Sequence, residues 1–124
     1  MINDYKLYQT GQNYLAQKRY SAAERYFKTA LSGYAATYDW AGEGNVRNGL
    51  GQLYLEQGRD TDARTEFWLG LLCHQAAHHP LGEAISLRGM GLTLYNQGYL
   101  DEAEVYFKDA RDLQDKYHTT NLGS

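Results

Sequence analysis

Proline and cysteine occur once each in the 124 residues, and no long apolar run is present. Because proline disrupts helix interiors, its scarcity favours long uninterrupted helices. One cysteine cannot form an intramolecular disulfide, so a reducing compartment is the simpler expectation. The opening residues, MINDYKLYQTGQ, lack the apolar stretch of a signal peptide, and nothing reaches the length of a membrane span. We therefore expect a cytoplasmic protein with no membrane partner.

An excess of charge of one sign is also missing, because 12 basic residues stand against 15 acidic ones, a net charge of −3. This balance gives no electrostatic reason to expect nucleic acid or an anionic membrane as a partner. Hydrophobic residues make up 43% and charged residues 22%, which is ordinary for a globular chain and argues against disorder. The length predicts a single domain spanning residues 1–124.

What the sequence does contain is a repeat of forty residues. The residues that return at this interval are Gly11, Gly51 and Gly91, then Ala23, Ala63 and Ala103, and then Phe27, Phe67 and Phe107. The segment AERYFKTA (23–30) matches AEVYFKDA (103–110) at six of eight positions. We interpret the chain as three copies of one unit, at about 4–42, 43–82 and 83–118, followed by a polar tail at 119–124.

Each unit carries the signals of two helices. The first helix of the second unit is predicted from about Glu43 to Gln57, where Gly58 supplies the left-handed residue that ends a helix. Gly98 has the same place in the third unit. Lys18 occupies it in the first unit, where it should strain or reshape the turn.

The second helix of each unit is expected to open on a capping residue. The candidates, forty residues apart, are Ser21, Thr61 and Asp101. Glu24 and Glu104 follow two of them at the spacing of a capping box. The repeated alanine and the phenylalanine four positions later share one helical face. The sequence therefore predicts an all-α chain of helical hairpins with an Ala–Phe core stripe.

The repeated positions resemble the tetratricopeptide repeat, in its forty-residue variant. In order along each unit, these positions hold a small residue, an aromatic residue three positions later and an alanine nine positions beyond that. A second aromatic residue and a second small residue follow. The three sets are Gly11, Tyr14, Ala23, Phe27, Ala30; Gly51, Tyr54, Ala63, Phe67, Gly70; and Gly91, Leu94, Ala103, Phe107, Ala110. Two features depart from the family pattern: Arg47 stands at a position that is usually large and apolar, and the helix-closing proline is missing.

The resemblance implies a right-handed α-solenoid of three stacked antiparallel helical hairpins. It also implies a non-catalytic protein- or peptide-binding module, acting as an adaptor, co-chaperone or regulatory scaffold. The residues themselves also favour a non-catalytic role. No nucleophile–base arrangement is present, and the glycines are explained by repeat positions rather than by a phosphate-binding loop. We expect no enzyme activity and no cofactor.

Two histidines are the weak candidates for a metal site. His74 and His78 are four residues apart and would share one face of a helix, as a two-point ligand set requires. The alternative is that His74 packs at the edge of the core and the remaining histidines form a polar helix end. We prefer this alternative and predict no metal.

By the resemblance, the first helices of the units line a concave groove that takes a peptide or a partner helix. The groove positions are Tyr5, Tyr8 and Gln12; Asn45, Asn48, Gln52 and Glu56; and Arg88, Leu92, Tyr95 and Asn96. Asn and Gln amides can pair with both the donors and the acceptors of a peptide backbone, and Arg88 can pair with a carboxylate. Polar exposed helix residues without any ligand would give the same pattern.

A second candidate surface emerges when the units are compared. Positions that are polar in the second helices of the first and third units are apolar in the second unit, as Trp68, Leu69 and Leu72, with Ala76 beyond. We call these four residues the outer patch. An outward apolar cluster with a tryptophan is typical of an interface. It predicts a protein partner or a homodimer, and a self-associating structural unit or a small secretion or assembly chaperone is the alternative function.

Overall fold

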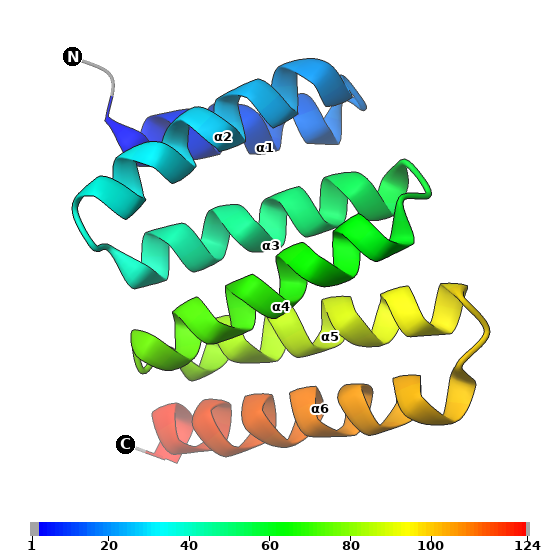
Figure 1. Ribbon diagram of the computed structural model, residues 1–124. Helices are drawn as coiled ribbons and strands as arrows, with labels where there is room; N and C mark the ends of the chain where they lie inside the picture. The colour runs from blue at the N-terminus through cyan, green and yellow to red at the C-terminus, as the bar shows by residue number, and fades with distance from the viewer. Residues whose placement is uncertain (1–2, 124) are drawn as a thin grey trace.

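The computed structural model describes residues 3–123, and the side chains of residues 3–117. Within this range the chain forms six α-helices and no strand (Figure 1). The helices are α1 (Asp4–Ala16), α2 (Tyr20–Ala36), α3 (Trp40–Glu56), α4 (Asp60–Ala76), α5 (Pro80–Asn96) and α6 (Leu100–Gly123). They pair as three hairpins that stack in chain order, with the two ends of the chain at opposite ends of the stack. The predicted all-α solenoid is confirmed.

The helices are joined by turns of one kind that recur every twenty residues. Four helices, α2 to α5, have 17 residues each. Every turn places one residue in the left-handed region, namely Lys18 (φ 59°), Tyr38 (φ 55°), Gly58 (φ 75°), His78 (φ 52°) and Gly98 (φ 89°). The turn at Lys18 is therefore not reshaped; the lysine adopts the backbone conformation that glycine supplies in the other two units.

The predicted N-caps Ser21, Thr61 and Asp101 are wrong. The second helices begin two residues earlier than helices capped by these residues would, so all three lie in the first helical turn. The N-cap residues of α2 and α4 are Arg19 and Arg59, and neither makes a side-chain capping bond. The physical reason is the turn itself, because the backbone N–H of each arginine donates to a carbonyl five residues earlier and fixes where the next helix starts.

The two glutamates of the expected capping boxes have other partners. Glu24 accepts a hydrogen bond of 2.7 Å from the hydroxyl of Tyr54, which joins α2 to α3. Glu104 pairs with Arg111 at 3.2 Å on α6. The start of α3 also differs from the prediction of Glu43. The helix begins three residues earlier, at Trp40, because the Asp39 carboxylate accepts from the Gly42 N–H at 2.9 Å and caps it.

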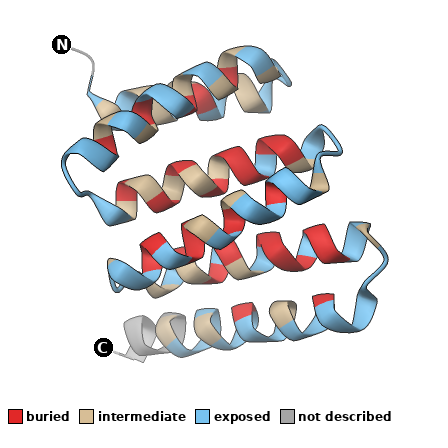
Figure 2. Cartoon of the chain, in the orientation of Figure 1, coloured by how far each residue is buried: buried red, intermediate tan, exposed pale blue. Residues whose placement is uncertain are grey.

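The core is built from phenylalanines that lie between pairs of glycines. Phe27 is buried against Gly11 of α1 and Gly49 of α3, and Phe67 is buried in the same way against Gly51 of α3 and Gly89 of α5. A methyl group at Gly89 would lie 2.3 Å from the Phe67 ring. The glycines thus permit the close helix approach that joins one hairpin to the next, and the buried positions concentrate on these facing sides (Figure 2).

Arg47, the departure from the repeat pattern, is held by carboxylates on both sides. Its guanidinium lies 3.2 Å from the Glu66 carboxylate of α4 and 3.9 Å from that of Glu43, one turn earlier on α3. Glu43 also accepts from the Cys73 thiol at 3.0 Å. Burial, followed by this hydrogen bond, raises the pKa of Cys73 to about 12, so the thiol stays protonated at neutral pH.

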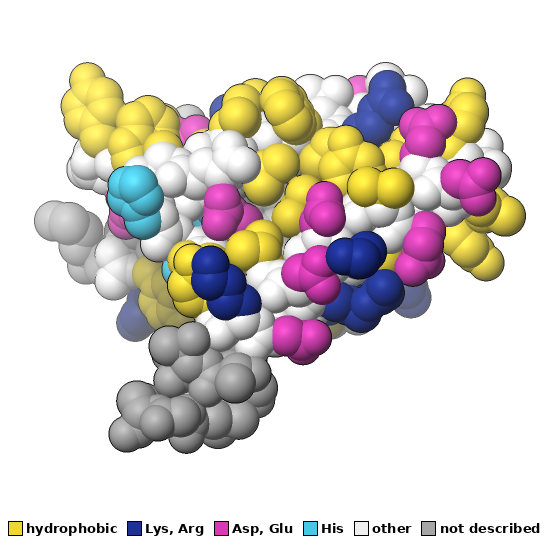
Figure 3. Space-filling model, turned by 90° about the horizontal axis from the view of Figure 1, so that it is seen from below, with side chains coloured by type: hydrophobic (Ala, Val, Ile, Leu, Met, Phe, Trp, Pro, Cys, Tyr) yellow, Lys and Arg dark blue, Asp and Glu magenta, His cyan; other side chains and the backbone are white. Residues whose placement is uncertain are grey.

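The outer face of α6 is polar at a position where α2 and α4 are apolar. Arg111 stands forty residues after Leu71 and eighty after Leu31, and it pairs with Glu104. In Figure 3, which views this end of the molecule, basic and acidic side chains intermingle and hydrophobic ones lie around them. The last hairpin therefore carries a charge pair at the position where the first two hairpins carry leucines.

Candidate functional site: the groove of the first helices

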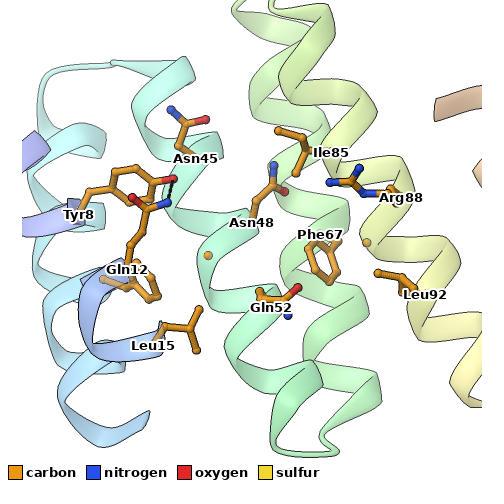
Figure 4. A pocket seen from close by; sticks show the side chains of 13 residues that line it. Tyr8, Gln12, Leu15, Asn45, Asn48, Gln52, Phe67, Ile85, Arg88 and Leu92 are labelled. Carbon is orange, nitrogen blue, oxygen red and sulfur yellow. Dashed lines mark hydrogen bonds between the residues drawn. The ribbon is translucent and has the colours of Figure 1, made fainter. Parts of the chain in front are cut away.

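The first helices of the hairpins lie on the inner side of the stack. Helix α3 contacts both α1 and α5, whereas no contacts join α2, α4 and α6 to one another within the part of the chain that the structure describes. The inner side holds a cavity of about 270 Å³. Its lining consists of Tyr8, Gln12 and Leu15 of α1; Phe27 of α2; Asn45, Asn48, Gly49 and Gln52 of α3; Phe67 of α4; and Ile85, Arg88, Gly89 and Leu92 of α5 (Figure 4). We call these residues the groove.

The structure brings seven of the eleven sequence-predicted positions together in the groove. They are Tyr8, Gln12, Asn45, Asn48, Gln52, Arg88 and Leu92. The other four, Tyr5, Glu56, Tyr95 and Asn96, lie on the same helices but are not among the lining residues. Position along the helix separates the two sets, because the four lie nearer the helix ends.

Asn48 occupies the middle of the groove and connects α3 to α5. It is only 8% exposed, and its side-chain oxygen accepts from the Ser86 hydroxyl at 2.8 Å. Gly70 of α4 makes room for it, since a methyl group there would lie 2.5 Å from the Asn48 oxygen. With the oxygen engaged, the amide nitrogen is the group that remains to donate to a ligand.

Two further amides are oriented by neighbours one turn away. Gln12 donates to the Tyr8 hydroxyl at 2.8 Å on α1, and Gln52 donates to the Glu56 carboxylate at 3.0 Å on α3. Burial raises the pKa of Tyr8, so its hydroxyl stays protonated at neutral pH. The side-chain oxygens of both glutamines therefore remain free to accept from a ligand.

Sequence reasoning missed most of the apolar part of the groove, although it named Leu92. Ile85 stands forty residues after Asn45 in the same register as Tyr5, so the repeat alone would have found it. The repeat pattern places Phe27 and Phe67 only in the core. They reach the groove because Gly49 and Gly89 carry no side chains over them, which depends on how the helices pack.

The histidines do not form the pair that the sequence suggested. Helix α4 ends at Ala76, and His78 lies in the turn with a left-handed backbone, so it does not share a helical face with His74. His74 is instead 0% exposed, with its ring between Gly44 of α3 and Gly82 of α5. Its Nδ1 lies 3.1 Å from Nδ1 of His79.

Burial, and then the charge of His79, lower the pKa of His74 to about 4. The imidazole is therefore a neutral core group at pH 7. Among residues 3–117, no three His, Cys, Asp or Glu side chains gather as a metal ion would require.

The outer patch lies on α4, away from the groove. Trp68 is 47% exposed and Leu72 is 42% exposed, while Leu69 is half-buried and Ala76 is exposed. The patch is therefore an apolar surface in the isolated chain rather than part of the core.

The three stacked hairpins, with inner first helices and glycine-spaced aromatic residues, define a helical-repeat solenoid. Models described as tetratricopeptide repeat match residues 6–67 and 83–114, and the chain belongs to this family. No curated protein and no solved structure matches the chain at a significant level. The segment between the two matches, 68–82, includes the outer patch and His74.

Tetratricopeptide repeats generally mediate protein–protein interactions and are typically non-catalytic. Of the helices described here, none combines the length and apolar character needed to cross a membrane.

Proposed function

We propose that this chain is a non-catalytic binding module that holds a peptide segment of a partner protein in the groove. Such a module acts as an adaptor, co-chaperone or regulatory scaffold, and the cytoplasmic location expected from the sequence is part of the proposal. The observation that carries it is the row of amides along α3. Asn45, Asn48 and Gln52 line one cavity together, and side-chain amides can pair with the main chain of a bound peptide.

Site-specific photo-crosslinking tests this proposal. A photoreactive residue at Gln52, in the groove, should give a discrete adduct with a partner in lysate of the native organism. The same photoreactive residue at Thr65, which is exposed on α4, is the matched control and should give no adduct. Asn48→Ala with Arg88→Ala should remove the adduct while helicity by circular dichroism persists. Equal labelling at both positions, or labelling that survives the double substitution, would contradict groove binding.

Self-association through the outer patch is a second candidate, favoured by the exposure of Trp68 and Leu72. Light scattering over a range of concentrations should then show a dimer, and Trp68→Glu with Leu72→Glu should give a monomer of unchanged helicity. A wild-type chain that is monomeric at high concentration would rule out the dimer. The outer patch would then remain available to a different protein, as in a small chaperone for secretion or assembly.

A further inference from the structure

Arg88 gives the groove an unbalanced positive charge. It is exposed on α5, and no hydrogen bond or ion pair holds its guanidinium within the described part of the chain. It is the one charged residue among those that line the cavity. The one acidic residue of the predicted groove set, Glu56, is already engaged by Gln52 at 3.0 Å and by Lys18 at 3.8 Å. An anionic group in the groove would therefore meet Arg88 without competition from a carboxylate of the lining.

Apolar side chains stand on both sides of this charge. Ile85 lies one helical turn before Arg88 and Leu92 one turn after it, about 4.5 and 6 Å along the helix axis. Both line the cavity, and both are exposed. In Figure 4 these three side chains of α5 face the amides of α3 across the cavity. The wall formed by α5 is thus apolar, cationic and apolar in succession.

The amides of α3 favour an extended ligand over a helical one. Asn45, Asn48 and Gln52 line the cavity together. An extended segment leaves its main-chain N–H and C=O groups free to pair with these amides, whereas a helix bonds these groups internally.

We propose that the groove selects an extended peptide segment in which an aspartate or glutamate lies between two apolar residues. The acidic side chain pairs with Arg88, and the apolar side chains pack on Ile85 and Leu92. The main chain pairs with the amides of Asn45, Asn48 and Gln52. This inference rests on the proposed function, because it requires that the groove binds peptides. A carboxylate–guanidinium pair is charge-assisted and directional, so it sets which segment binds.

A phage-displayed library of random short peptides tests this specificity on the purified full chain. Peptides enriched on the wild type should share an acidic residue with aliphatic or aromatic neighbours. A synthetic peptide of that consensus should bind about tenfold more weakly, by fluorescence anisotropy, when its acidic residue is replaced by the amide. The Arg88→Glu chain should no longer bind the consensus peptide. It should instead bind the same peptide with lysine in place of the acidic residue.

Arg64→Glu is the matched control, because Arg64 is exposed on α4 and lies outside the cavity lining. It makes the same change in net charge and should leave binding unchanged. Enriched peptides without an acidic residue, or consensus binding that survives Arg88→Glu in a chain of native helicity, would overturn this inference and leave groove binding standing. If no peptide is enriched on the wild type, the proposed function fails and this inference fails with it.

Discussion

Acid should destabilise this protein through His74. The ring lies fully buried between Gly44 and Gly82, and its pKa falls from the ordinary value of 6.5 to about 4. In the unfolded chain the imidazole returns to water and takes up a proton at the ordinary pKa. The unfolded state therefore binds more protons between these two values. The stability is fully present above pH 6.5 and is lost as the pH falls toward 4.

The magnitude follows from the two pKa values. A single group shifted from 6.5 to about 4 removes about 2 kcal/mol of the free energy of unfolding between pH 7 and pH 5. The total loss approaches about 3 kcal/mol near pH 4, where the folded state also begins to protonate. Small domains have only about 5–15 kcal/mol of stability, so an effect of this size is measurable.

Urea unfolding followed by far-UV circular dichroism at a series of pH values measures this effect. His74→Leu removes the titrating ring and keeps an apolar side chain of similar size, so its stability should fall less than that of the wild type between pH 7 and pH 5. The difference between the two proteins should be about 2 kcal/mol, which separates His74 from the carboxylates that titrate in both. His79→Gln, at the exposed neighbour, should retain most of the wild-type slope. Parallel profiles for the wild type and His74→Leu would refute the reasoning.

Three further substitutions test the packing. Lys18→Gly should stabilise the chain by about 1 kcal/mol, because the left-handed backbone at φ 59° penalises a Cβ. Gly89→Ala should destabilise it by about 2 kcal/mol, because the new methyl would lie 2.3 Å from the Phe67 ring. Tyr54→Phe should cost about 1–2 kcal/mol, because it removes the donor of the 2.7 Å hydrogen bond to Glu24. The midpoint of urea unfolding at pH 7 measures all three.

Each of these predictions has an outcome that contradicts it. Gly58→Ala tests the opposite change to Lys18→Gly. A methyl group at residue 58 meets open space, but the backbone φ is 75°, so the Gly58→Ala chain should be less stable than the wild type. If neither variant changes the midpoint, the left-handed residue carries no penalty in these turns. An unchanged midpoint for Gly89→Ala would mean that α5 is not held against Phe67. Unchanged stability of Tyr54→Phe would mean that water replaces the bond at no cost.

The amino-acid sequence by itself determined the repeat, the hairpins and most of the groove. The forty-residue register places one face of each first helix in equivalent positions, and the resemblance to the tetratricopeptide repeat implied that this face, with the three amides of α3 and Arg88, lines a groove. The glycines at 58 and 98 also marked helix ends correctly, because a left-handed residue is a local requirement of the chain. A helix-ending glycine depends only on a few neighbouring residues, so tertiary packing does not change its role.

Packing between helices decided the rest. Ser21, Thr61 and Asp101 are good caps in isolation, yet the turns close through hydrogen bonds to carbonyls five residues earlier and set the helix starts elsewhere. His74 became a core residue because glycines from two other helices make room for its ring. Phe27 and Phe67 reach the groove for the same reason. The places of His74 and of the two phenylalanines depend on which residues meet across helices, and that contact exists only once the hairpins have stacked.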